Sequence, residues 1–415
     1  MIRDIFTVLR GSVIAQAIGF LLLPVISRLF GPEAFGQFTV YQSVILILGV
    51  VVCGRYDFAI ISAEDAGEAR KLASLSLLLA VAVAVVLALS VAILEAADLA
   101  RRIIELPFSL FVLPLAALAA ASALVSTALL TRLGQFPASA RSRMIQALVT
   151  AGLPAGLGWF SAAAIVLVMG DIAGKAMAAL YGLGRKFRLD RHGLGKVARK
   201  YRSYPTYSVL GGLLNNGGTA ITPIMMYSTY SAGVSGQFAL VDRAISLPLG
   251  VVVIAVSQVF AAHFGAALRK QPRAAREQLT KIVRNLTLLG LAPMAIGIFT
   301  APLLFDLVFG EQWERAGHFA QLLAPMYLSS LVVGPLSMAL LVLGGVRTQL
   351  GWEAGRLVLL VALWLTVRIT GLPPESAMLL FCGVNILVNV VFVGLTYRLL
   401  DQRIAAIASL SSPKD

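Results

Sequence analysis

The sequence predicts an all-α polytopic membrane protein with about twelve transmembrane helices, on three observations. Hydrophobic residues make up 59% of the 415 residues and charged residues 13%, whereas charged residues form about a quarter of an average soluble protein. A helix needs about 20 apolar residues to cross the hydrocarbon, so the chain has room for about a dozen spans. The two halves of the chain also repeat each other at an offset of about 200 residues.

The repeat is clearest in two short runs. Gly36-Gln37-Phe38 corresponds to Gly236-Gln237-Phe238, and Gly49–Val52 corresponds to Gly250–Val253, both reading Gly-Val-Val-Val. The order of these features is the same in both halves, which chance matches between common membrane residues do not explain. Two related halves are typical of transporters that rock about a binding site between the halves.

The apolar runs place the spans in two sets of six. A polar stretch at 185–202 separates the sets, so we expect an N-terminal six-helix lobe (1–184), a basic cytoplasmic linker (185–202), a C-terminal six-helix lobe (203–400) and a cytoplasmic tail (401–415). The expected spans are 7–29, 37–58, 71–94, 107–130, 143–160, 162–183, 204–227, 237–262, 283–305, 318–342, 353–370 and 376–398.

The distribution of Lys and Arg predicts the orientation. With the N-terminus inside, the inner segments carry 26 of these residues and the outer segments 5. The positive-inside rule therefore places both termini in the cytoplasm. Six spans per repeat is an even number, so the two lobes have the same orientation and are related by an axis along the membrane normal.

Composition and spacing exclude several other classes. The net charge of +14 is dispersed among loops between apolar runs, which favours lipid phosphate over nucleic acid as the anionic partner. No cluster of His, Cys and acidic residues has the spacing of a metal site, and no glycine-rich phosphate loop precedes a helix. Cys53 and Cys382 are far apart in apolar stretches and are expected to pack as small hydrophobic residues. The sequence therefore supports no enzymatic activity.

Charged residues inside the spans are the informative ones, because an ionisable group in hydrocarbon normally faces a partner or a wet cavity. Asp171 and Lys175 lie one turn apart near the middle of the sixth span, where they either pin helices together or serve transport. Asp242 and Arg243 are adjacent and point about 100° apart, so they need different partners. Under the repeat Asp242 corresponds to Gln42, which makes the same helix of each lobe polar at one depth. Asp171 and Asp242 are the only acidic residues expected deep inside spans.

The remaining polar residues of the spans have two readings each. Arg28 and Arg55 lie near span ends, where an isolated arginine is often an anchor that reaches the interface. Asn215, and the pair Asn385 and Asn389 one turn apart, are polar enough to bind a cation or to bond helices together, and the second role is the more common.

Several motifs resemble one family along nearly the whole chain. They resemble those of Wzx-type O-antigen flippases, in the polysaccharide transporter branch of the multidrug/oligosaccharidyl-lipid/polysaccharide (MOP) superfamily. The motifs are Leu23-Pro24, the run Ser27–Gly36, Arg55-Tyr56-Asp57, the run Phe309–Gly317, Gly334–Ser337, and Trp352-Glu353 with Arg356.

This resemblance implies a MATE-like fold and the translocation of an undecaprenyl-pyrophosphate-linked oligosaccharide. The lipid would move from the inner to the outer leaflet of a bacterial cytoplasmic membrane by alternating access, without a cofactor and with coupling to H⁺ or Na⁺. Other polysaccharide assembly proteins are implied partners, besides membrane lipids. Family members line a cavity with cationic residues, and the positions here that would supply them are Arg28, Arg55 and Arg243. The candidates for coupling or for polar cavity lining are Asp171, Lys175, Asp242, Gln42, Asn215, Asn385 and Asn389.

Two alternatives stay open at the level of sequence. A cation-coupled drug antiporter of the same superfamily would share the architecture, with carboxylates and aromatic residues rather than arginines governing the cavity. A membrane enzyme of polysaccharide assembly would need a large outer loop. The longest outer loop expected, around Glu95 to Leu106, is only about a dozen residues and shorter than such a loop usually is.

Overall fold

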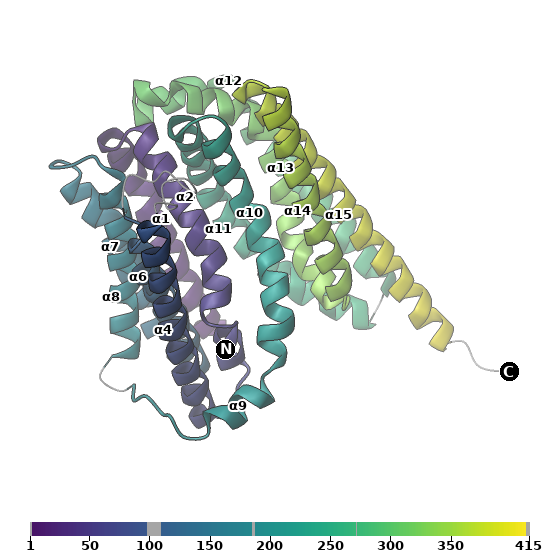
Figure 1. Ribbon diagram of the computed structural model, residues 1–415. Coiled ribbons are helices and arrows are strands. Elements are labelled where there is room, and N and C mark those ends of the chain that lie inside the picture. Colours follow the sequence, from purple (N-terminus) through teal and green to yellow (C-terminus); the bar gives the residue numbers. More distant parts are fainter. Residues whose placement is uncertain (1, 98–108, 185–186, 271, 412–415) are drawn as a thin grey trace. The chain divides into compact units, whose positions relative to one another are not determined.

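A computed structural model describes residues 2–97, 109–184, 187–270 and 272–411, which form helices joined by short turns (Figure 1). The shorter elements in this part of the chain are α3 (Tyr56–Ile61), α9 (Leu194–Lys200), the π-helical turn η1 (Tyr204–Ser208) and the 3-10 turn η2 (Glu311–Trp313). The helices of 20 residues or longer are α1 (Ile2–Leu29), α2 (Pro32–Val52), α4 (Ala66–Ala96), α6 (Val112–Arg132), α7 (Phe136–Leu157), α8 (Ala164–Leu183), α10 (Val209–Thr229), α11 (Ala232–Lys270), α12 (Pro272–Phe309), α13 (Glu314–Val342), α14 (Val346–Thr370) and α15 (Pro374–Ser411).

Each of these long helices corresponds to one expected span, so the all-helical fold class is confirmed. Ten of them are long and apolar enough to cross a membrane. The two others, α7 and α10, are diluted by polar residues: α7 carries Arg141 and Arg143, and α10 carries Asn215 and Asn216. The outer loop expected around Glu95 to Leu106 lies largely outside the described residues. The segment expected as a tail from 401 continues α15 as helix to Ser411.

Contacts divide the chain into two compact units, Met1–Ala239 and Leu240–Asp415. The division falls within α11 rather than in the linker at 185–202, because α10 packs against α2 and so joins the first unit. The six-helix lobes follow the sequence repeat instead of the packing, and their boundaries stay a prediction.

Small residues allow close helix packing in the first unit. The pair α7 and α8 is an example: a methyl group on Gly174 would lie 2.8 Å from the carbonyl oxygen of Gln146, and one on Gly170 would lie 2.9 Å from that of Thr150. The space for either methyl is already filled by backbone. Membrane helices associate through such contacts because lipid provides no hydrophobic force between them.

One close crossing joins the starts of α2 and α11 within the first unit, and it is reciprocal. A methyl group on Gly36 would overlap the carbonyl oxygen of Ala232, and a methyl group on Gly236 would overlap the carbonyl oxygen of Pro32. Gly36 and Gly236 are the positions that the sequence repeat pairs. A contact in which residue i meets j′ and j meets i′ is the mark of a local two-fold relation. The repeat seen in the sequence is therefore also present in the packing.

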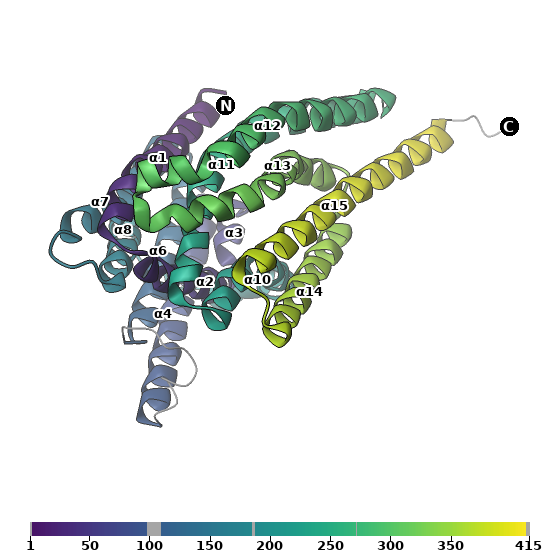
Figure 2. The ribbon, with the colours of Figure 1, turned by 90° about the horizontal axis from the view of Figure 1, so that it is seen from above.

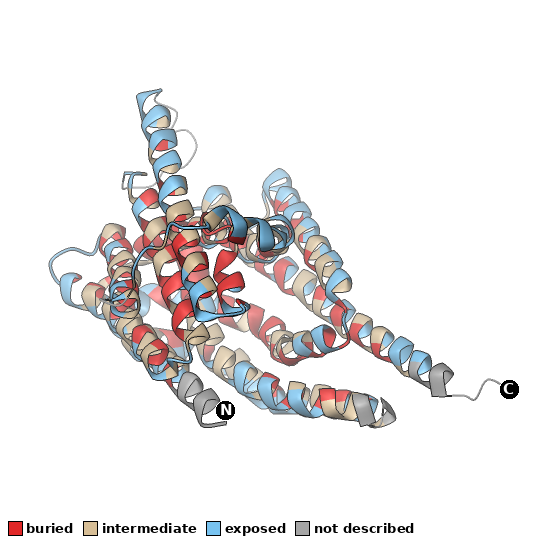
Figure 3. Cartoon of the chain, turned by 90° about the horizontal axis from the view of Figure 1, so that it is seen from below, coloured by how far each residue is buried: buried red, intermediate tan, exposed pale blue. Residues whose placement is uncertain are grey.

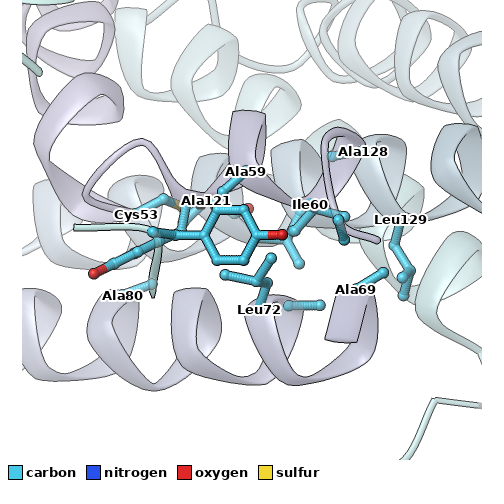
Figure 4. Packing of buried hydrophobic residues seen from close by; sticks show 14 of the residues in the cluster. Cys53, Ala59, Ile60, Ala69, Leu72, Ala80, Ala121, Ala128 and Leu129 are labelled. Carbon is cyan, nitrogen blue, oxygen red and sulfur yellow. Dashed lines mark hydrogen bonds between the residues drawn. The ribbon is translucent and has the colours of Figure 1, made fainter. Parts of the chain in front are cut away.

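A buried apolar cluster holds the short helix α3 against α4 and α6. Ile60 and Leu72 are fully buried in it, and Ala121 on α6 completes the contact (Figure 4). Helix α4 begins with a side-chain cap, since the Asp65 carboxylate accepts the backbone N–H of Glu68 at 2.7 Å. This cluster fixes the backbone next to the turn between α2 and α3.

In the second unit, α13 packs against α12 and α15, and α14 packs against α15 (Figure 2). Its main apolar cluster gathers Phe264, Leu336 and Phe392. Burial alternates along the helices of both units (Figure 3). Large apolar side chains such as Leu21 and Phe299 are exposed, as expected of helices that face hydrocarbon.

Candidate functional site

The turn between α2 and α3 has an unusual backbone. Helix α2 ends at Val52 and α3 begins at Tyr56, whereas the sequence predicted one span through residue 58. Gly54 has φ 54°, and Arg55 has φ 59° and ψ 14°. Among the residues that the structure describes, Arg55 is the only non-glycine residue with positive φ. Such a conformation costs about 1–3 kcal/mol and persists only where its surroundings hold it, often at functional sites.

The Arg55 side chain lies half-buried between an aromatic ring and a glycine. Its guanidinium carbon Cζ is 4.7 Å from the centre of the Phe58 ring, a cation–π distance. On α10, a methyl group at Gly212 would lie 2.7 Å from Arg55 Nε and 2.8 Å from Cζ. Arg55 Nε is buried and has no hydrogen-bond partner in the described chain. The guanidinium is thus held in place with donor capacity to spare.

Asp57, two residues further on, is also buried and incompletely bonded. It is 6% exposed, and its Oδ1 has no hydrogen-bond partner among the described residues. In this part of the chain no ion pair joins it to Arg55. Burial raises the pKa of the Asp57 carboxyl, and the Arg55 charge and backbone N–H groups oppose that rise. The two charges therefore interact through space without forming a salt bridge.

Polar contacts attach α9 to the helices around this turn. Lys200 Nζ lies 2.6 Å from Glu68 Oε1 and 2.9 Å from Glu64 Oε2, and Tyr201 donates its hydroxyl to Glu68 Oε2 at 2.9 Å. The hydrogen bonds to Glu68 and Glu64 raise the pKa of Lys200. Tyr56 donates to the carbonyl oxygen of Ala198 at 3.4 Å. The basic linker is thus hydrogen-bonded to α3 and α4.

A second polar group lies between α2 and α8. The Asp171 carboxylate is buried, and its Oδ2 accepts the hydroxyl of Tyr41 at 2.9 Å and the ammonium of Lys175 at 2.6 Å. The spacing of Asp171 and Lys175 predicted that they share a face, and they form an ion pair across one helical turn. Tyr41, 130 residues away in sequence, ties this pair to α2.

The two arginines expected in the cavity from the first half do not converge. Arg28 is in the last turn of α1, just before α2 begins, and Arg55 follows the end of α2. Twenty-one residues of helix separate the two ends of α2, which corresponds to about 30 Å. Arg28 and Arg55 cannot hold the same phosphate group at the same time.

Two further candidates of the first unit lie on α2 and α10. Gln42 follows Tyr41 and is half-buried, and Asn215 is on the exposed side of α10. The neighbouring Asn216 donates its amide to the carbonyl oxygen of Leu46 at 3.0 Å and so bonds α10 to α2. Asn216 therefore serves to bond two helices together, the more common of the two roles expected for asparagines in the spans.

The candidates of the second unit lie on α11 and α15. Helix α11 begins at Ala232, five residues before the expected span, so Asp242 lies about 15 Å along it. Asp242 Oδ1 accepts hydrogen bonds from Ser246 at 2.9 Å and from Tyr327 of α13 at 3.3 Å. The neighbouring Arg243 is half-buried.

Asn385 and Asn389 differ in role although they lie one turn apart. Asn389 donates to the hydroxyls of Ser329 at 2.8 Å and Ser330 at 3.4 Å, which joins α15 to α13. Asn385 donates to the carbonyl oxygen of Phe381 in its own helix at 2.8 Å. Asn389 therefore bonds α15 to α13, whereas the Asn385 amide donates a hydrogen bond within α15.

The sequence reading missed a buried acidic residue. Glu353 is 5% exposed, and its Oε2 lies 3.7 Å from Arg356 Nη1. The Arg356 guanidinium lies 5.7 Å from the Trp352 ring. Glu353 thus joins Asp171 as a buried acidic residue of a long helix, although Asp171 and Asp242 were the only acidic residues expected deep inside spans. The expected eleventh span began at Glu353, whereas α14 begins at Val346; the i, i+3 spacing of Glu353 and Arg356 was the available signal.

The described residues hold no group of three His, Cys, Asp or Glu side chains arranged for a metal ion. Cys53 and Cys382 are both buried free thiols. The charged groups that the structure places in or beside the helices are therefore arginines, lysines and carboxylates.

Comparison with solved structures shows a shared fold. An inward-facing multidrug resistance MATE family transporter of the MOP superfamily has a TM-score of 0.73 at 15% identity, covering 97% of this chain and 100% of that one. The lipid II flippase MurJ in an inward closed conformation has a TM-score of 0.70 at 11% identity, covering 98% and 92%. A MOP superfamily transporter from Pyrococcus furiosus has a TM-score of 0.60 at 15% identity, covering 98% and 96%.

Comparison with sequences gives the family. No curated protein matches the chain. A family described as "Polysaccharide biosynthesis protein" matches residues 25–317, which is more than half of the chain. The similar solved structures named above are those of transporters and of a flippase. The chain is a multi-pass membrane protein that belongs to the polysaccharide biosynthesis protein family, and it shares its fold with transporters of the MOP superfamily.

Proposed function

We propose that this protein is a flippase for an undecaprenyl-pyrophosphate-linked oligosaccharide, such as an O-antigen or other polysaccharide repeat unit. It moves the lipid from the inner to the outer leaflet of a bacterial cytoplasmic membrane by alternating access. Family membership supports a polysaccharide-related cargo, and the likeness to the lipid II flippase supports a lipid-linked one. Both termini are in the cytoplasm in this proposal, following the distribution of basic residues.

The observation that carries the proposal is the Arg55 turn. A pyrophosphate diester bears about two negative charges, and its passage through a low-dielectric region is prohibitive unless fixed cations replace its water. A guanidinium suits that task because its planar fork binds phosphate oxygens in pairs. Arg55 is held in an unfavourable backbone conformation, and its buried Nε–H has no partner among the described residues, so an incoming anion would complete its hydrogen bonds.

The positions of the arginines suggest an order of use. In the proposed orientation Arg55 lies at the cytoplasmic end of α2 and Arg28 at the outer end. Arg55 receives the headgroup from the inner leaflet, and Arg28 serves at the exit. Arg243, in the second unit, is the third arginine that the sequence predicts for this role. The sugar needs only polar space, and the prenyl chain can stay in lipid.

Transport is coupled in this proposal to an H⁺ or Na⁺ gradient through acidic residues of the spans. Asp171 and Asp242 are the candidates, and each is bonded by a tyrosine hydroxyl from a neighbouring helix. A change of charge at either carboxylate would therefore alter a hydrogen bond between two helices. Other polysaccharide assembly proteins are the expected partners in the membrane.

Reconstitution with a lipid-linked oligosaccharide tests the proposal. Arg55→Ala should abolish delivery to the outer leaflet, measured with a membrane-impermeant lectin, and Arg55→Lys should restore it only in part because a point charge replaces a two-pronged contact. Arg70→Ala is the matched control, because Arg70 is an exposed arginine at the same predicted face. The amount of folded protein is measured alongside delivery.

Normal delivery by Arg55→Ala at normal abundance would remove Arg55 from the site. Transport of an organic cation, with no movement of the lipid-linked sugar, would instead identify a drug antiporter. The fold is compatible with that result, since a multidrug transporter shares it.

A further inference from the structure

The Arg55–Asp57 segment carries two opposite charges, one half-buried and one buried, that form no ion pair with each other in the described part of the chain. Arg55 Nε and Asp57 Oδ1 are buried and each lack a hydrogen-bond partner in the described chain, and Asp57 as a whole is only 6% exposed. A buried polar atom without a partner is costly, and a salt bridge between the two side chains would satisfy both. The segment therefore holds the Arg55 guanidinium and the Asp57 carboxylate apart, although a salt bridge between them would be favourable.

The geometry shows what holds them apart. The left-handed backbone of Gly54 and Arg55 turns the arginine toward α10, where the missing Cβ of Gly212 leaves room for the guanidinium. The Phe58 ring lies 4.7 Å from Arg55 Cζ. Asp57 is fixed in α3, which the buried cluster around Ile60 and Leu72 anchors. The packing around Arg55 and Asp57 therefore keeps the guanidinium and the carboxylate apart, against their electrostatic attraction.

We propose that Asp57 is the release group of the Arg55 site and that Gly212 positions the Arg55 guanidinium for the incoming phosphate. This inference rests on the proposed function. With the headgroup bound, the guanidinium bonds phosphate oxygens against α10. When the lipid has to leave, the guanidinium turns to the Asp57 carboxylate, which replaces a phosphate oxygen as its acceptor. The exchange moves no proton and breaks no covalent bond.

The same argument explains why a carboxylate is useful next to a phosphate-binding arginine. An arginine that binds pyrophosphate without competition would hold it, since charge-assisted bidentate hydrogen bonds are among the strongest in proteins. A nearby carboxylate competes for the guanidinium, which weakens phosphate binding and shortens the lifetime of the bound state. Transport needs release as much as binding, and Asp57 supplies the competition.

Separate measurements of binding and translocation test this inference. The full-length protein is placed in nanodiscs for binding of a fluorescent polyprenyl pyrophosphate, and in vesicles for single-turnover translocation of the same probe. Asp57→Asn should bind the probe about tenfold more tightly and translocate it more slowly. Asp57→Glu, which keeps the charge, should restore most of the translocation rate.

Gly212→Ala tests the positioning of Arg55 without a change of charge. A Cβ there would displace the end of a flexible arginine side chain, so the fold is expected to persist while the affinity for the probe falls about tenfold. Gly49→Ala on α2 is the matched control, because its Cβ would meet no atom within 4 Å. A merely structural role for Gly212 would move thermal stability and leave affinity unchanged.

The outcomes separate the two proposals. If the wild-type protein does not bind the pyrophosphate probe, the proposed function fails. If it binds the probe, and Asp57→Asn leaves binding unchanged or weakens it, the release role is wrong and the proposed function stands. Should Asp57→Asn not fold, unchanged affinity in Gly212→Ala overturns the inference on its own.

Discussion

The Asp171 carboxylate in α8 accepts two hydrogen bonds at one oxygen, from Tyr41 and from Lys175. The ammonium neutralises a buried negative charge, and the hydroxyl links that charge to α2. This arrangement fits two roles: a structural ion pair that pins the helices, or a coupling site in which the carboxylate changes partner. Removing one member of a buried pair leaves an unpaired charge, so single variants do not separate the roles.

The double variant Asp171→Asn/Lys175→Met separates them because it removes both charges together. If the pair couples transport to a gradient, this variant should keep normal abundance and probe binding but lose dependence of delivery on the H⁺ or Na⁺ gradient. Delivery is measured in vesicles with and without each gradient. Unchanged gradient dependence would assign the pair a structural role and would direct the search to Asp242, for which Asp242→Asn is the corresponding variant.

Single residues show how far sequence reasoning reached. The ion pair of Asp171 and Lys175 followed from a spacing of four, because helix geometry fixes which residues share a face. Tyr41 did not follow, since nothing local indicates a contact across 130 residues. The left-handed Arg55 was equally hidden: Gly54 marks a break, but the conformation of the arginine depends on packing by α10 and α4. Glu353 was missed because the start of its helix was placed seven residues too late.

At the scale of elements, the crossing of α2 and α11 predicts that a glycine-to-alanine substitution destabilises the protein at the crossing but not elsewhere in α2. Gly36→Ala should lower the thermal unfolding midpoint of the purified protein by several degrees, because the new methyl overlaps the Ala232 carbonyl oxygen, a cost of about 1–3 kcal/mol. Gly236→Ala should do the same through Pro32.

Gly49→Ala in the same helix α2 is the control for this effect. Its methyl has open space, and alanine favours helix over glycine by about 1 kcal/mol, so its midpoint should stay level or rise. Equal midpoints for Gly36→Ala and Gly49→Ala would contradict the close crossing.

Elements were predictable where hydropathy alone decides them. Every expected span has its helix, with ends displaced by up to 13 residues, because about 20 apolar residues in sequence suffice to specify a membrane helix but not where it ends. The break after Val52 was the exception. There an apolar run of residues spans a turn, and hydropathy does not distinguish a straight helix from two short ones.

For the whole molecule, the split of basic residues predicts the topology. A reporter enzyme that is active only outside the cytoplasm should work when fused after Trp313 and fail when fused at Lys196 or at the C-terminus. The assay compares reporter activity per amount of fusion protein in whole cells. Activity at Lys196 would reverse the orientation and would place Arg55 at the outer rather than the cytoplasmic end of α2.

The reciprocal contact of Gly36 and Gly236 also bears on the origin of the chain. A surface that meets its own equivalent is the kind of surface through which two identical subunits form a dimer. A half-length ancestor with one such glycine would have offered the contact to a second copy of itself, and gene fusion would then have made it internal. Each glycine is now held by the carbonyl oxygen of the other half, so the two halves can diverge elsewhere but have to keep this position small together.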